Sequence, residues 1–179
     1  MFKKQAVYVF IYFSNLTFNL MPFFLLKKIF LVLLGAKIGK NSTLHTPIKF
    51  FNLTRKLNIG SNVTINPGCY LDDRGGIFIG NNVNISHSVR IYTAGHNINS
   101  PDMRYFERSV LISDNVWIFP NVLIMPGVKL GKGCVILPGA VVTKSYPERS
   151  IVGGNPSKIV GSRDCGTNYC INHSYWFVN

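Results

Sequence analysis

Residues 112–142 read ISDNVW IFPNVL IMPGVK LGKGCV ILPGAV V, with an aliphatic residue opening every block of six. The opening residues are Ile112, Ile118, Ile124, Leu130, Ile136 and Val142. A small or apolar residue recurs four places after each of the first five openings, at Val116, Val122, Val128, Cys134 and Ala140. Similarity at a constant period is the signature of a repeat protein, so this stretch decides the fold.

The same period extends toward the N-terminus. It is clear at Ile59, Ile65, Leu71, Ile79, Ile85 and Ile91 and fainter at Ile38, Leu44 and Phe50. Six residues with one inward aliphatic side chain make one short strand and one turn, and three such units complete a triangular coil that buries its aliphatics by stacking on its neighbours. Gly, Asn and Asp crowd the expected corners, as in Gly60-Ser61-Asn62, and tolerate tight turns. The sequence therefore predicts an all-β, parallel β-helix.

The charge of the chain is basic and uneven. Its 179 residues carry a formal net charge of +12 and an apolar content of 47%, which is ample for one domain with appendages. No Asp or Glu precedes Asp72. A basic surface without acids suits nucleic acid, a membrane or a phosphorylated ligand. Because aliphatic residues surround these charges, we expect a membrane surface and no nucleic acid partner.

Four cysteines give neither a zinc pattern nor a disulfide framework. Cys69 and Cys134 occupy the small-residue position of their hexads and are expected to be buried, while Cys165 and Cys170 lie in a polar tail. The sequence thus favours a reducing compartment and no metal site.

The first 36 residues form a separate apolar and basic segment. Residues 5–26 lack charge, and polar residues fall on one helical face at Gln5, Tyr8, Tyr12, Asn15 and Asn19. Pro22 should end or kink this helix, and a second should run from Phe23 to Leu34, stopped by Gly35. We expect both helices to lie on the cytoplasmic leaflet, held by apolar burial and by Lys3, Lys4, Lys27 and Lys28. Alternatives are a membrane span, or packing on the β-helix or a neighbouring subunit.

The β-helix is expected over residues 37–163, with a tail at 164–179. Its period is interrupted once at length, by a loop at 93–109. A loop ejected from a regular solenoid is a usual place for function, which makes His96 at its base the main candidate for catalysis. His87, nine residues earlier, is the rival candidate but sits in a regular corner.

Residues 57–163 resemble the hexapeptide-repeat acyltransferases. The similarity lies in the order of several short motifs. They are Val116-Trp117-Ile118, Pro126-Gly127-Val128, Pro138-Gly139-Ala140-Val141-Val142-Thr143-Lys144 and Gly153-Gly154-Asn155-Pro156-Ser157-Lys158. The pattern is most similar to the maltose and galactoside O-acetyltransferases and to sugar O-acetyltransferases of surface-polysaccharide clusters. This resemblance implies a left-handed parallel β-helix and a homotrimer.

The resemblance also implies roles for individual residues. His96 would be the general base, and a neutral imidazole near pH 7 suits proton removal from a sugar hydroxyl. Acetyl-CoA would lie between neighbouring subunits. The cofactor-binding residues implied are Pro120, Pro138, Thr143, Lys144, Lys158 and Arg163. Phe119 replaces the family's usual glycine after Trp-Ile.

On the acceptor side, the resemblance implies contacts from Asn66 and Asp73, with Tyr70, Asp72 and Arg74 bordering the same pocket. The group that orients His96 stays open among Asp73, Asp102 and Glu107. The most favoured function is transfer of an acetyl group from acetyl-CoA to a sugar hydroxyl in O-antigen or capsular polysaccharide assembly. The acceptor would be a sugar or a lipid-linked oligosaccharide, and the enzyme would lie on the inner face of the cytoplasmic membrane.

Four alternatives remain. They are N-acetylation of an amino sugar, acetylation of an antibiotic, a trimeric scaffold without catalysis, and a zinc enzyme on the same fold, for which a third histidine with suitable spacing is missing.

Overall fold

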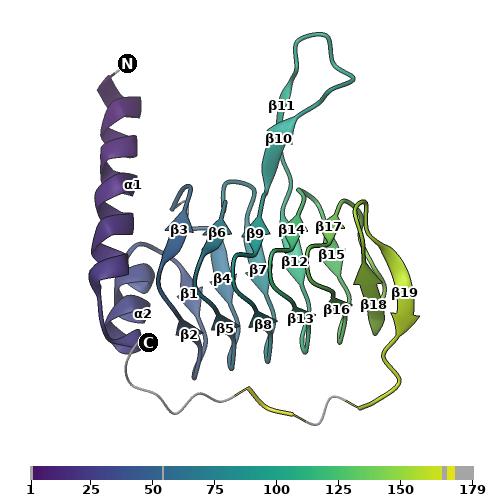
Figure 1. Ribbon diagram of the computed structural model, residues 1–179. Helices are drawn as coiled ribbons and strands as arrows, with labels where there is room; N and C mark the ends of the chain where they lie inside the picture. The colour runs from purple at the N-terminus through teal and green to yellow at the C-terminus, as the bar shows by residue number, and fades with distance from the viewer. Residues whose placement is uncertain (1, 54, 167–168, 172–179) are drawn as a thin grey trace.

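The computed structural model describes residues 2–53, 55–166 and 169–171 and shows a three-sided parallel β-solenoid with two helices at its N-terminal end (Figure 1). The predicted parallel β-helix is confirmed. The first side contains β1 (Lys37–Ile38), β4 (Leu57–Ile59), β7 (Ile77–Ile79), β12 (Val110–Ile112) and β15 (Lys129–Leu130). The second side contains β2 (Thr43–Leu44), β5 (Thr64–Ile65), β8 (Asn84–Ile85), β13 (Trp117–Ile118), β16 (Val135–Ile136), β18 (Ser150–Gly153) and the antiparallel β19 (Lys158–Ser162). The third side contains β3 (Ile48–Phe50), β6 (Cys69–Leu71), β9 (Arg90–Ile91), β14 (Leu123–Ile124) and β17 (Val141–Val142).

The six-residue period becomes the core. On the third side, Leu71 pairs in register with Phe50 and Ile91, and Ile124 pairs with Ile91 and Val142. These side chains point inward and are almost completely buried, as are the corresponding residues of the other two sides. Each coil thus buries apolar surface against its neighbouring coils, and the first coil also packs against the N-terminal helices.

The three corners are numbered here by the sides they join. The first corner joins the first and second sides, the second corner joins the second and third, and the third corner joins the third and first. Asparagines with positive φ stack along the first corner, where φ lies between 56° and 60° at Asn41, Asn62, Asn82 and Asn115. Asparagine adopts this left-handed conformation more readily than most residues with a side chain, which explains its recurrence.

The N-terminal segment forms α1 (Phe2–Leu20) and α2 (Phe24–Leu33), so the predicted break at Pro22 is confirmed. Two asparagines of α1 bind the outer edge of β3. Asn15 donates through Nδ2 to the Phe50 carbonyl and accepts from the Phe50 N–H at Oδ1, at 2.9 and 2.8 Å. Asn19 makes the same pair with Ile48 at 2.9 Å each. Each side-chain amide therefore replaces the backbone of a missing neighbouring strand.

The spacing of this cap follows from geometry. Four residues of helix rise about 6 Å, and two residues of strand advance about 6.6 Å. Asn15 and Asn19 consequently meet Phe50 and Ile48, two positions apart on β3. An unpaired edge strand invites pairing with other chains, and the helix covers this one.

Lys27 corrects one sequence-based expectation. Its side chain was expected at a membrane surface, but it is fully buried between α2 and the first coil. Its Nζ donates to the Leu44 carbonyl at 3.3 Å and to Thr46 Oγ1 at 3.1 Å, and burial lowers the pKa of Lys27 to about 8. The expectation was wrong for Lys27 because sequence periodicity cannot show which lysine fills the space beneath the helix.

Candidate active site

A β-hairpin leaves the solenoid at the third corner, where the period was predicted to break. It consists of β10 (Ala94–His96) and β11 (Tyr105–Glu107), pairs antiparallel, and projects away from the solenoid body (Figure 1). Thr93 anchors its base. The Thr93 hydroxyl donates to the Asp72 carbonyl at 2.6 Å and accepts from the Gly75 N–H at 2.8 Å, and both groups belong to the preceding coil.

His96 ends β10 with an exposed imidazole whose Nδ1 lies 2.6 Å from the Met103 carbonyl oxygen. A carbonyl oxygen only accepts hydrogen bonds, so Nδ1 must carry the hydrogen. The neutral ring then presents an unprotonated Nε2, which is the tautomer that a general base requires. Met103 turns its carbonyl toward the ring through a backbone with φ of 48°.

This orienting group was missed by sequence reasoning because a main-chain carbonyl has no side-chain signature. Two of the three carboxylates considered for the role bind residues of the hairpin or of the neighbouring coil. Asp102 pairs with Ser100 and Arg104, and Glu107 accepts from the Tyr105 hydroxyl at 2.8 Å and pairs with Lys56 at 3.4 Å. Asp73 is buried and lines a small cavity with residues that include Leu31 and Leu57.

A cationic and aromatic cluster lies between the hairpin and the third side. Arg74 makes a bidentate ion pair with buried Asp72, with both bonds at 2.8 Å, and these bonds raise the pKa of Arg74. Its Cζ lies 4.3 Å from the Phe51 ring centre and 5.7 Å from that of Tyr105. Tyr105 in turn lies 5.7 Å, edge to face, from His96. Burial, followed by the hydrogen bond to Glu107, raises the pKa of Tyr105.

The hollow around His96 has a volume of about 450 Å³, and every residue lining it belongs to segment 96–108. Neither Asn66 nor Asp73 lines it. Asn66 lies at the second corner, where its Nδ2 donates to the Ile85 carbonyl at 3.0 Å. Their roles in acceptor binding therefore stay predictions, and a single chain does not bring them into the hollow.

The predicted cofactor residues also lie at different corners of the solenoid. Pro120 and Pro138 lie at the second corner, where the Gly139 N–H donates to the Pro120 carbonyl at 3.0 Å. His87 lies in the next coil of the same corner, and its carbonyl accepts from the Asn121 N–H at 3.1 Å. Thr143 and Lys144 are exposed at the third corner, where the hairpin also begins. The two groups thus follow the two edges of the third side.

Lys158 is exposed on β19, whereas Arg163 is engaged by the chain's own tail. The Arg163 guanidinium lies 5.1 Å from the Tyr169 ring centre and donates to its hydroxyl at 3.3 Å. Tyr169 packs edge to face on Trp117 at 5.7 Å. Among the predicted cofactor cations, Lys144 and Lys158 are therefore the more accessible pair.

Two absences apply to the described residues alone. In that part of the chain, no three His, Cys, Asp or Glu residues gather in a way that would hold a metal ion. Across the same residues, neither helix combines the length and the apolar character that crossing a bilayer requires.

The repeats and hairpin define a hexapeptide-type β-solenoid, and comparison with known proteins agrees. Residues 109–144 match the bacterial transferase hexapeptide (six repeats) family. The galactoside O-acetyltransferase of Lactococcus lactis is 34% identical over 75% of this chain, and the chain spans 64% of that protein's length.

Solved structures extend the similarity over most of the chain. A hexapeptide-repeat acetyltransferase from Vibrio cholerae, solved with acetyl coenzyme A, matches with a TM-score of 0.81 and 27% identity over 90% of this chain and 89% of its own. A maltose O-acetyltransferase from Clostridium difficile matches with a TM-score of 0.81 and 29% identity over 89% and 87%. The chain is therefore similar to hexapeptide-repeat acetyltransferases in its repeats and in its fold.

Proposed function

We propose that this protein transfers an acetyl group from acetyl-CoA to a hydroxyl group of a sugar. The observation that carries the proposal is the hydrogen bond between His96 Nδ1 and the Met103 carbonyl, because it leaves Nε2 as a base at an exposed position. The names of the relatives, which include galactoside and maltose O-acetyltransferases, support the same reaction.

The chemistry requires one base and no protein nucleophile. Bound acetyl-CoA supplies the acetyl group as an activated thioester. His96 Nε2 removes the proton of the sugar hydroxyl while the sugar oxygen bonds to the acetyl carbon. The C–S bond then breaks, and the imidazolium returns the proton to the departing thiolate. The Met103 carbonyl accepts from Nδ1 throughout and stabilises the positive ring.

The chain's exposed cations fit a phosphorylated ligand such as coenzyme A. Lys144 and Lys158 are both exposed and have no acidic partner among the ion pairs of the described residues. A homotrimer would complete the site, because the hollow at His96 is lined by hairpin residues alone while Asn66, Pro120 and Pro138 follow another corner. A neighbouring copy can bring its second corner to this hairpin.

The setting we propose is polysaccharide assembly at the inner face of the cytoplasmic membrane. The support is the outer surface of the two helices, where apolar side chains are exposed, including Val9 at 55%, Phe13 at 57%, Leu25 at 66% and Leu33 at 80%. The asparagine face of α1 is occupied by β3, so this apolar face is the one left to meet a lipid surface.

The reaction is tested by measuring coenzyme A release with methyl galactoside as acceptor. His96→Ala should lower turnover about 10²- to 10⁴-fold, the usual contribution of a positioned base, with acetyl-CoA binding retained. His87→Ala is the comparison, since this residue was the rival candidate. Near-native turnover in His96→Ala would remove His96 from the mechanism. If His87→Ala instead lost turnover about 10²- to 10⁴-fold, His87 would take its place.

A further inference from the structure

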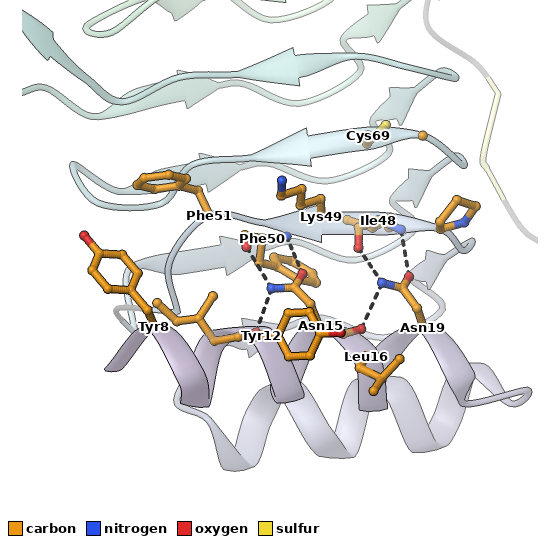
Figure 2. A pocket seen from close by; sticks show the side chains of 13 residues that line it. Tyr8, Tyr12, Asn15, Leu16, Asn19, Ile48, Lys49, Phe50, Phe51 and Cys69 are labelled. Atoms are coloured by element: carbon orange, nitrogen blue, oxygen red, sulfur yellow. Dashed lines mark hydrogen bonds between the residues drawn. The ribbon is translucent and has the colours of Figure 1, made fainter. Parts of the chain in front are cut away.

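An apolar groove of about 650 Å³ runs between α1 and the third side of the solenoid (Figure 2). Tyr8, Tyr12 and Leu16 line it from the helix, and Lys49 and Phe51 line it from the strand side. Its inner wall includes the two asparagines that hold the helix on β3. The groove is therefore a fixed feature of the way the helix caps the solenoid.

Cations lie at the strand side of this groove. Lys49 Nζ lies 6.0 Å from the Tyr70 ring centre, and Tyr70 pairs in register with Lys49 and with exposed Arg90 on the third side. Arg74 lies directly beyond Phe51. Its bonds to Asp72 use Nε and Nη2, which leaves the hydrogens of Nη1 for another acceptor.

The groove is connected to His96 by a continuous chain of contacts. Arg74 Cζ lies 4.3 Å from the ring centre of Phe51, which lines the groove, and 5.7 Å from the ring centre of Tyr105. The ring centres of Tyr105 and His96 lie 5.7 Å apart. Along this path the surface changes from apolar to cationic and then to the base. A molecule with a hydrocarbon chain, a phosphate and a sugar presents the same three kinds of group in the same order.

We propose that the groove holds the hydrocarbon chain of a lipid-phosphate-linked sugar, with its phosphate at Lys49 and Arg74 and its sugar extended toward His96. The inference rests on the proposed acetyl transfer and specifies its acceptor class. The occupant is a lipid because the lining is apolar and aromatic and adjoins the exposed apolar face of α1. The adjacent charge is positive, which complements a phosphate.

The first experiment measures kcat/KM for galactosides with the same sugar and a methyl, butyl or octyl group, all below the micelle concentration. Full burial of one methylene corresponds to about fourfold in affinity, so partial burial should raise kcat/KM at least about tenfold from methyl to octyl. Leu16→Asp should reduce this preference to less than about threefold. The matched control is Leu20→Asp, which alters the same helix outside the groove lining and should keep the preference.

The second experiment needs no catalysis. Binding of dodecyl phosphate is measured by titration calorimetry and should weaken about tenfold or more in Lys49→Gln but stay unchanged in Lys129→Gln, a lysine exposed on the first side. If no galactoside is acetylated but dodecyl phosphate binds in this pattern, acetyl transfer fails and the groove assignment stands. If the enzyme is active but its kcat/KM does not change with the length of the alkyl group, the groove assignment is overturned. So would an altered oligomeric state in Leu16→Asp, because the groove would then be an interface between copies.

Discussion

The asparagine cap on β3 leads to a quantitative prediction about stability. Asn15→Ala removes both bonds to Phe50, a residue that is only 1% exposed. An unsatisfied buried polar group costs about 1–3 kcal/mol, and this substitution leaves two. The higher helix propensity of alanine stabilises the folded state by about 0.7 kcal/mol. We therefore expect the free energy of unfolding to fall by about 1–5 kcal/mol.

The assay is urea unfolding followed by circular dichroism, with Thr17→Ala as the control. Thr17 is exposed on the same helix and gains a similar helix propensity, so its substitution should be neutral or slightly stabilising. Asn15→Asp keeps an acceptor for the Phe50 N–H but places a carboxylate against the Phe50 carbonyl, and should destabilise at least as much as alanine. Equal midpoints for Asn15→Ala and Thr17→Ala would refute the strand-edge explanation.

Three further predictions concern the exposed lysines, the buried Lys27 and the apolar face of α1. Lys144→Ala and Lys158→Ala should raise the KM for acetyl-CoA more than they lower kcat, and the effects should shrink with dephospho-CoA as donor; a loss confined to kcat would contradict their placement at phosphates. Because the folded state lowers the pKa of Lys27 to about 8, the unfolded chain binds more protons above that pH, so stability relative to Lys27→Met should rise by up to about 3 kcal/mol from pH 8 to 10.5. A flat difference across that interval would show that the lysine is not titrating in place. Val9→Asp combined with Phe13→Asp should abolish sedimentation with anionic vesicles while leaving acetylation of methyl galactoside intact, and unchanged sedimentation would reject membrane binding through α1.

The solenoid could be predicted because its signal is local and repeated. Ile112, Ile118 and Ile124 each occupy the same place in a unit, and stacking requires only that the period stays constant. Pro22 and the long interruption after Ile91 are equally local signals, and both coincide with breaks in the structure. The sequence does not show which surface the polar face of α1 contacts, because the spacing of polar residues gives the face of the helix but not its partner.

The same distinction explains which parts of the site were foreseen. His96 is identified by its place at the interruption, but its partner is the carbonyl of Met103 across the hairpin, which any residue type can supply. Arg163 carries the charge that a phosphate needs, yet Tyr169 from the tail occupies its guanidinium. Contacts made by the backbone or by distant segments thus escape a reading based on residue types.

The asparagine cap also connects stability with specificity. The bonds from Asn15 and Asn19 fix α1 on β3, and this placement turns the apolar face of the helix outward and creates one wall of the groove. If the groove selects lipid-phosphate-linked sugars, Asn15→Ala should lower the preference for octyl over methyl galactoside at temperatures where the solenoid is still folded. The same substitution tests whether a residue outside the hollow at His96 determines which acceptor reaches His96.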